Sequence, residues 1–345
     1  MKKKGENTAY IELKKAASDG SFKNLYLFFG EERYLLEYYL GQMRKLIVAA
    51  GTEEFNHKRL DGKKLDPAEL SEAVDALPVF SERTLIEVSD FDIFKCAEPL
   101  KEEFLRILSD VPDYICVVFV YDTIEYKPDG RVKINSALKK CFETVEFEKQ
   151  EQSDLLNWIG RRFKALGKHI DRKTSEYLAF ISGGLMTTLV SEIEKTAAYE
   201  KGETITRKSI DAVVTPVLDA VTYKMTDAIL QKRFDDAAQM LSDLLRMREA
   251  PHRILYSVSM KMRQLLAAKV CAESGKGVSE LMRTCGISYE FQARGLMAAE
   301  RGASFGFCKN AVRLCSKAAL SLNSAGSAEP EQVMSQLILE LSMAV

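Results

Sequence analysis

The residues best placed to do chemistry near the start of this sequence are Gly30, Glu31 and Glu32. They follow an apolar run at residues 24–29 and precede a segment, up to Ile47, whose apolar residues recur with a period near 3.6. This predicts a buried strand, a tight turn and an amphipathic helix. In a nucleotide-binding α/β domain, glycines and a lysine in this turn wrap phosphates at the helix N-terminus. Two carboxylates suit the positive end of a helix dipole but repel an anion. The sequence therefore predicts such a scaffold without its phosphate site.

Other nucleotide-binding motifs are incomplete. A Walker A loop needs Gly-x-x-x-x-Gly-Lys followed by Ser or Thr, because its backbone donors, lysine and hydroxyl contact different parts of the nucleotide and its magnesium. Three Gly-Lys pairs, at residues 62–63, 167–168 and 275–276, lack both the hydroxyl and the leading glycine. A Walker B motif would place Asp-Glu after a strand, where the chain has Asp90 with Asp92, and Asp122 with Glu125. We interpret these carboxylates as solvated strand ends rather than as a magnesium site.

Cysteine and histidine offer little for catalysis or metal binding. The seven cysteines include no CxxC pair, and the three histidines have no Cys or His partner at ligand spacing. We therefore predict no metal site, no cofactor and no catalytic residue, with the cysteines as small core residues in a reducing compartment. No run approaches the roughly 18 apolar residues of a membrane span. The polar residues after the N-terminal lysines do not form a secretory signal, so we expect a cytoplasmic protein without a membrane partner.

Charge limits the nucleic-acid functions that the chain could have alone. Residues 1–150 carry 23 basic and 28 acidic residues, residues 151–215 carry 10 and 9, and residues 216–345 carry 16 and 13. Strong autonomous binding to a phosphate backbone usually appears as a basic domain. Residues 275–301 resemble a helix-turn-helix with Arg294 exposed, but their leucines and methionines favour packing in a helical bundle. Any contact with nucleic acid must therefore be local or shared with partners.

The first 150 residues alternate between strand and helix patterns. Five segments that read as strands lie at residues 24–30, 55–60, 84–88, 114–120 and 142–147. Asp66 and Pro67 begin a helix, since Asp is a good N-cap and Pro a good first helical residue. The run at 114–120 is apolar on both faces, as central parallel strands are, and the run at 55–60 reads as an edge strand. This alternation predicts one three-layer α/β domain with a five-stranded parallel sheet.

From Ser153 onward the pattern is helical throughout. Short helices separated by glycines fill residues 151–215 and predict a small helical domain. After Pro216 the helices lengthen, and residues 216–345 are expected to form a third, all-helical domain. The predicted fold is thus an α/β domain at residues 1–150 followed by two all-α domains.

A turn between helix and strand carries apolar residues among charged neighbours. Leu77, Val79 and Phe80 surround Pro78, which removes a backbone donor and stops the helix. An exposed aliphatic–aromatic pair at a helix end is a typical anchor for a pocket on a partner protein. The alternative, which the pattern alone favours, is that Phe80 folds back onto the sheet as a buried plug.

Taken in order, several segments of this chain resemble the delta subunit of the bacterial DNA polymerase III clamp loader. They are residues 25–35, 77–83, 183–195, 226–228 and 263–266. The resemblance implies an AAA+-like first domain without a working ATP site, a helical lid and a helical collar for oligomerisation, which fits the three-part division. It also implies that Val79 and Phe80, with Leu77 beside them, bind the sliding clamp. The family's usual leucine is replaced here by the shorter Val79.

The resemblance implies mechanical work rather than chemistry. The chain would bind the sliding clamp and open the ring, so that the ATP-driven complex can load it onto primed DNA. Its partners would be the clamp, the clamp-loader ATPase subunits and the delta-prime subunit. The chain would not be an enzyme by itself, but a subunit of the polymerase holoenzyme, a nucleotidyltransferase complex. Two other functions stay open: an active AAA+ type ATPase, and a DNA-binding regulatory protein.

Overall fold

The computed structural model describes residues 7–324 and 329–344. Its contacts divide the chain into two compact units: Met1–Asp154 with Leu185–Thr187, and Leu155–Gly184 with Thr188–Val345. The boundary that we predicted between residues 215 and 216 lies inside the second unit. The division into three domains therefore stays a prediction.

The first unit is built on a five-stranded sheet in the order β2-β3-β4-β1-β5. Every pair of neighbouring strands is parallel, and Leu27 in β1 lies beside Phe119 of β4 and Thr144 of β5. The strands are β1 (Leu25–Phe29), β2 (His57–Asp61), β3 (Thr84–Ser89), β4 (Ile115–Val120) and β5 (Glu143–Glu146). The predicted fold class, a five-stranded parallel α/β domain followed by helices alone, is confirmed, and the second strand lies at an edge as expected.

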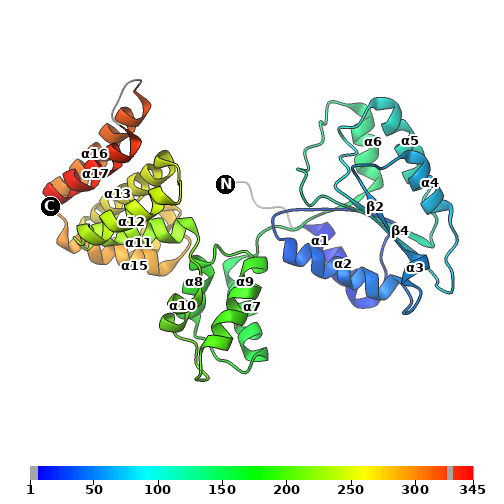
Figure 1. Cartoon of the computed structure of the whole chain (residues 1–345), viewed down its shortest axis with the longest axis horizontal. Coiled ribbons are helices and arrows are strands. Elements are labelled where there is room, and N and C mark those ends of the chain that lie inside the picture. The colour runs from blue at the N-terminus through cyan, green and yellow to red at the C-terminus, as the bar shows by residue number, and fades with distance from the viewer. Residues whose placement is uncertain (1–6, 325–328, 345) are drawn as a thin grey trace. The chain divides into compact units, whose positions relative to one another are not determined.

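Helices cover both faces of this sheet, because successive side chains of a strand point to opposite faces. In β4, Val117 and Phe119 pack in one apolar cluster with helices α4, α5 and α6. Cys116 and Val118 pack in another with α1 and α2. Figure 1 shows these two helical layers on either side of the strands. The helices are α1 (Thr8–Asp19), α2 (Arg33–Ile47), α3 (Glu53–Asn56), α4 (Pro67–Asp75), α5 (Glu98–Leu108) and α6 (Lys133–Cys141).

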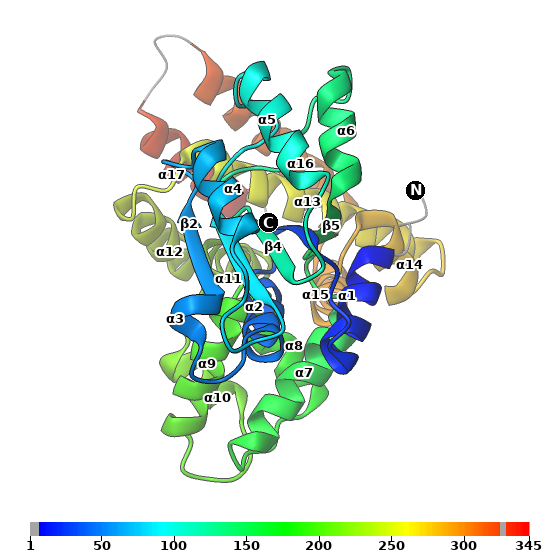
Figure 2. The same cartoon turned by 90° about the vertical axis from the view of Figure 1, so that its right-hand side faces the viewer.

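The structure differs from the expected elements at two places in this unit. Phe55 and Asn56, which we assigned to the second strand, end the four-residue helix α3, and β2 begins at His57. Figure 2 shows α3 at the start of β2. Helix α6 was not expected at all. Its apolar residues Ile134, Leu138 and Cys141 recur at helical spacing and pack against one apolar cluster of the sheet, but the helix is only nine residues long.

The second unit is entirely helical among the residues that the structure describes, apart from one isolated bridge between His169 and Thr204. One apolar cluster joins α11, α12, α13, α16 and α17, and another joins α13 to α15 with the start of α16. The helices are α7 (Gln152–Ala165), α8 (Arg172–Ile181), α9 (Met186–Tyr199), α10 (Arg207–Val213), α11 (Leu218–Leu230), α12 (Phe234–Arg246), α13 (Pro251–Glu273), α14 (Val278–Cys285), α15 (Glu290–Ala299), a 3-10 turn (Glu300–Gly302), α16 (Phe305–Asn323) and α17 (Pro330–Met343).

An aromatic cluster connects α8 to helices much later in this unit. The ring centroid of Phe180 lies 5.1 Å from that of Tyr223 in α11, 5.5 Å from that of Tyr289 and 5.4 Å from that of Phe291 in α15. These edge-to-face contacts are the arrangement that aromatic quadrupoles favour. They bring partly buried rings from both sides of position 216 into contact.

Residues 275–301 pack as a bundle element, as we interpreted them. Leu281 and Leu296 are fully buried, with Met282 and Met297 packed against the same cluster. Arg294 is exposed and pairs with Glu290 at 2.6 Å.

Across the described residues, no helix is both long and apolar enough to cross a membrane.

Candidate functional site

The loop between α4 and β3, residues 76–83, presents its apolar side chains to solvent. Helix α4 begins as predicted, since the Asp66 carboxylate accepts a hydrogen bond from the Ala68 amide at 2.8 Å and Pro67 is its first residue. It ends at Asp75, before Pro78. Beyond it Leu77 is 72% exposed and Phe80 is 91% exposed. The interpretation of Phe80 as a buried plug is therefore wrong.

Hydrogen bonds that involve buried or half-buried side chains fix this loop on both sides of Phe80. The Asn56 side chain accepts from the Val79 amide at 2.8 Å and donates to the Val79 carbonyl at 2.6 Å. At the other end, Arg83 donates to the Phe22 carbonyl at 2.8 Å and to the Asn24 side chain at 3.0 Å. The loop is thus held in place while Phe80 points away from the core.

Two residues near this loop were missed by the sequence reasoning. Phe55 is 57% exposed and directly precedes Asn56, which is completely buried. An exposed phenylalanine beside a buried asparagine is the reverse of what burial preferences predict. No local signal marks Asn56, because its partner Val79 lies 23 positions away.

The first strand-to-helix turn is shaped by the chain after β5. Gly30 has φ +134, and a Cβ built on it would lie 2.4 Å from the Phe147 carbonyl oxygen. The Glu32 amide donates to the same carbonyl at 2.9 Å. The peptide backbone of Phe147 therefore approaches the turn so closely that only glycine fits.

The two glutamates of this turn have different environments. Glu31 is exposed and pairs with Lys149 at 3.2 Å. Glu32 is completely buried, and its Oε2 accepts a hydrogen bond at 3.2 Å from the amide of Met186, the first residue of α9, which belongs with Leu185–Thr187 to the first compact unit. Its Oε1 has no hydrogen-bond partner. Burial raises the pKa of Glu32, and the hydrogen bonds from the Met186 and Tyr34 amides offset this only in part.

Glu32→Gln is expected to stabilise the protein at neutral and higher pH by about 1 kcal/mol. A carboxyl group whose pKa is raised by folding destabilises the folded state when it is ionised. The gain should therefore be complete above the folded-state pKa of Glu32 and disappear as the pH falls towards its unfolded-state pKa. Thermal unfolding of both proteins at several pH values measures this, with Glu31→Gln as the exposed control. A lower melting temperature for Glu32→Gln at pH 8 would show that the Met186 amide stabilises the carboxylate more than burial destabilises it.

A pocket of about 600 Å³ lies at the carboxyl ends of β1, β4 and β5. This edge, where the chain order of the strands reverses, is the usual place for ligands in open α/β sheets. The lining is mainly acidic: its charged members are Glu31, Asp122, Glu125, Glu146, Glu148 and a single basic residue, Lys149. Such a lining repels phosphate rather than attracting it.

The candidate Walker B carboxylates are bound by the protein itself. Asp90 accepts hydrogen bonds from the Asp122 amide at 2.7 Å and from the amide and hydroxyl of Thr123, both at 2.8 Å. Partial burial works against ionisation of Asp90, but these hydrogen bonds outweigh it and lower its pKa. Asp92 pairs with Lys95 at 2.8 Å, and Asp122 pairs with Arg33. Asp90 therefore connects the end of β3 to the loop after β4.

Within residues 7–324 and 329–344 no group of three His, Cys, Asp or Glu side chains could hold a metal ion.

A five-stranded parallel sheet between two helical layers, followed by helices, defines an α/β protein with a helical C-terminal part. Residues 26–148 match the family described as "DNA polymerase III, delta subunit", and residues 219–341 match "DNA polymerase III delta subunit, C-terminal domain". The chain belongs to the family of DNA polymerase III delta subunits, which confirms the resemblance.

One curated relative and several solved structures are similar to this chain. The chain is 26% identical to the DNA polymerase III subunit delta of Bacillus subtilis over 274 residues, which cover 77% of this chain and 78% of that one. Among solved structures, the Bacillus subtilis DNA clamp loader delta protein matches at 21% identity with a TM-score of 0.47, over 96% of this chain and 99% of that one. The Thermotoga maritima RuvB Holliday junction branch migration motor matches at 13% identity with a TM-score of 0.42, over 82% of each chain. Both TM-scores lie below 0.5, so the family assignment rests on the sequence matches.

Proposed function

We propose that this clamp-loader delta subunit binds the sliding clamp through Leu77, Val79 and Phe80 and opens the ring. The observation that carries the proposal is the 91% exposure of Phe80 on a loop that hydrogen bonds hold in place. An aromatic ring that the fold leaves uncovered, next to two further apolar residues, is the surface that a hydrophobic pocket on a partner recognises. Val79 is 38% exposed. Because its side chain is shorter than the family's usual leucine, it would bury less apolar area in a pocket on the clamp.

Binding energy takes the place of catalysis in this mechanism. ATP binds to the partner ATPase subunits, and their rearrangement brings the loop to the clamp. Insertion of the apolar pair then stabilises a clamp with one interface open, and the delta-prime subunit completes the loader that delivers it to primed DNA. As a component of the polymerase III complex, the chain acts in the cytoplasm.

The direct test uses the isolated chain and the clamp. Binding to immobilised clamp should be saturable without ATP, because the loop is already exposed in the free chain. Ring opening is measured as a loss of fluorescence energy transfer between two labels placed on either side of one clamp interface. Binding without a change in this signal would support a docking role without ring opening, and absence of binding would remove the proposed function.

The isolated chain is expected neither to bind ATP tightly nor to hydrolyse it. Glu31 and Glu32 occupy the turn in which phosphates would bind, and the neighbouring pocket is mainly acidic. Titration calorimetry with ATP and magnesium should show no heat of binding at micromolar concentrations. Tight, magnesium-dependent binding would instead favour the alternative of an active AAA+ type ATPase.

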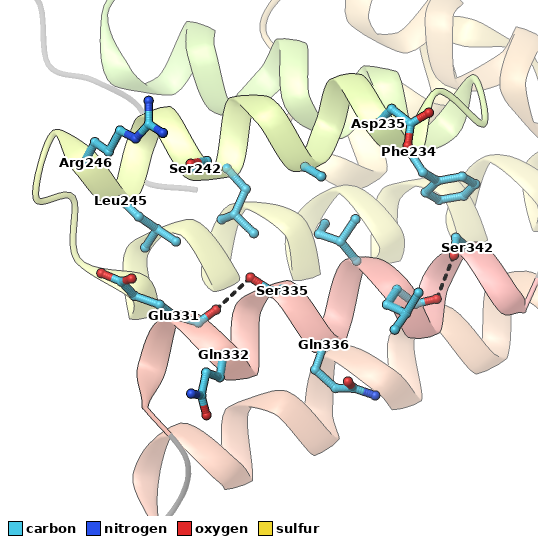
Figure 3. A pocket seen from close by; sticks show the side chains of 14 residues that line it. Phe234, Asp235, Ser242, Leu245, Arg246, Glu331, Gln332, Ser335, Gln336 and Ser342 are labelled. Carbon is cyan, nitrogen blue, oxygen red and sulfur yellow. Dashed lines mark hydrogen bonds between the residues drawn. The ribbon is translucent and has the colours of Figure 1, made fainter.

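Residues 216–345 form the oligomerisation collar in this proposal. A groove of about 750 Å³ runs between α12 and α17, with Phe234 at one end and Arg246 and Glu331 at the other (Figure 3). Its lining includes Leu339, which is 53% exposed. Apolar residues such as Leu241, Leu245 and Ile338 alternate in its lining with polar and charged ones, and such a mixed groove suits an amphipathic helix of a partner subunit.

Leu339→Glu is therefore expected to weaken assembly with the ATPase subunits at least about tenfold, because it places a charge in an apolar contact. Gel filtration of mixtures at decreasing concentration measures this. Ala298→Glu, at an exposed position of α15 outside the groove, is the matched control. Equal assembly of the two variants would argue against the groove as a subunit contact.

A further inference from the structure

The side chain of Asn56 forms hydrogen bonds with both the backbone amide and the backbone carbonyl of Val79, as a residue of a neighbouring strand would. Its Oδ1 accepts from the Val79 amide and its Nδ2 donates to the Val79 carbonyl, at 2.8 and 2.6 Å. The Asn56 side chain makes two further hydrogen bonds: Nδ2 donates to the Thr52 carbonyl at 3.3 Å, and Oδ1 accepts from the Thr84 hydroxyl at 3.4 Å. An amide with two donors and two acceptor sites is fully satisfied by these four bonds. Asn56 is completely buried, so water does not compete for them.

The residue that follows Val79 has a backbone conformation that a phenylalanine rarely adopts. Phe80 has φ +53, in the left-handed region. Such a conformation persists only where the surrounding structure fixes the chain on both sides. Asn56 fixes the preceding residue, and Arg83 fixes the following segment through the Phe22 and Ile115 carbonyls at 2.8 and 3.3 Å.

We propose that Asn56 is the positioning residue of the clamp-binding loop. This inference rests on the proposed function. Asn56 is buried and touches no partner itself; it acts through Val79, and it keeps the Phe80 ring in the exposed orientation that fits a pocket. A loop ordered before it binds loses less conformational entropy on binding. Without Asn56, only a fraction of molecules would present the loop in the orientation that binds the clamp. The apparent affinity for the clamp would then be the intrinsic affinity multiplied by that fraction.

Asn56→Asp tests this with almost no change in shape. When ionised, the carboxyl group still accepts from the Val79 amide but cannot donate to the Val79 carbonyl, so the pair of bonds is broken above the pKa of the new aspartate. We expect hydrogen exchange of the Val79 and Phe80 amides in the free protein to accelerate at least about tenfold, and clamp affinity to fall about tenfold. Asn157→Asp, at an exposed position of α7, is the matched control and should change neither.

A double-mutant cycle separates positioning from a general structural effect. In a Phe80→Ala background, Asn56→Asp should weaken clamp binding less than about threefold, because the main side chain that it positions is gone. An equal loss of clamp affinity in the wild-type and Phe80→Ala backgrounds would overturn the inference. Faster hydrogen exchange of the Val79 amide with unchanged clamp affinity would overturn it as well. If Asn56→Asp does not fold, Asn56→Ser, whose hydroxyl is too short to bond both Val79 atoms, is measured in the same way.

The same measurements distinguish the two levels of the proposal. If wild-type protein binds the clamp and Phe80→Ala does not, but Asn56→Asp and Asn56→Ser bind normally, the proposed function stands and the role of Asn56 falls. If wild-type protein does not bind the clamp, both fall, whatever the exchange rates show.

Discussion

Phe80→Ala is expected to weaken clamp binding by about 2 kcal/mol or more, roughly 30-fold, while the melting temperature of the free protein stays unchanged. The side chain is 91% exposed, so its removal leaves no cavity in the fold. On a clamp, the same ring would be buried in a pocket and would behave as a binding hot spot. Affinity measured on immobilised clamp, together with thermal unfolding, gives both quantities from one protein preparation.

Leu166→Ala is the control, since Leu166 is an apolar residue that is 47% exposed outside the loop. It should bind the clamp as the wild type does. A Phe80→Ala protein that binds and opens the clamp normally would show that the anchor lies elsewhere. A protein that melts much lower would mean that Phe80 is packed in solution, in conflict with its exposure in the structure.

Gly30→Ala should lower the free energy of unfolding by at least about 3 kcal/mol, because overpacking and a strained backbone add together. A Cβ at this position would lie 2.4 Å from the Phe147 carbonyl oxygen and 2.6 Å from the Phe147 amide nitrogen. Backbone atoms cannot turn away as a flexible side chain can, so β1 and the chain after β5 would have to separate. Urea unfolding followed by circular dichroism measures the loss.

Gly41→Ala is the matched control for this substitution. Gly41 lies in α2 of the same unit, and a Cβ there would meet nothing within 4 Å. Alanine should stabilise the helix by about 0.5–1 kcal/mol at this position. If both alanine variants were equally stable, the close approach of Phe147 would not constrain the turn.

The strands could be predicted because their signal is local. The run at 115–120 is apolar at every position, and all six residues are buried in the centre of the sheet. The start of α4 was equally clear from Asp66 and Pro67. By contrast, the four residues of α3 are fewer than the period of a helix needs to show itself, so Phe55 and Asn56 appeared to extend the neighbouring strand.

The candidate site was harder to predict than the fold. Leu77, Val79 and Phe80 stand out because apolar residues interrupt a charged turn, but sequence cannot say which way Phe80 points. Its direction depends on hydrogen bonds between Asn56 and Val79, which are far apart in the chain. The family resemblance supplied the functional interpretation of these three residues, and their contact with the clamp stays a prediction.

The aromatic cluster around Phe180 has a mechanical consequence for the helical part of the chain. Rings from α8, α11 and α15 interlock at centroid distances of 5.1–5.5 Å from Phe180, across the point where we expected one domain to end and another to begin. Close-packed side chains resist deformation and transmit strain. A force on the C-terminal helices would therefore be transmitted to α8 through these ring contacts.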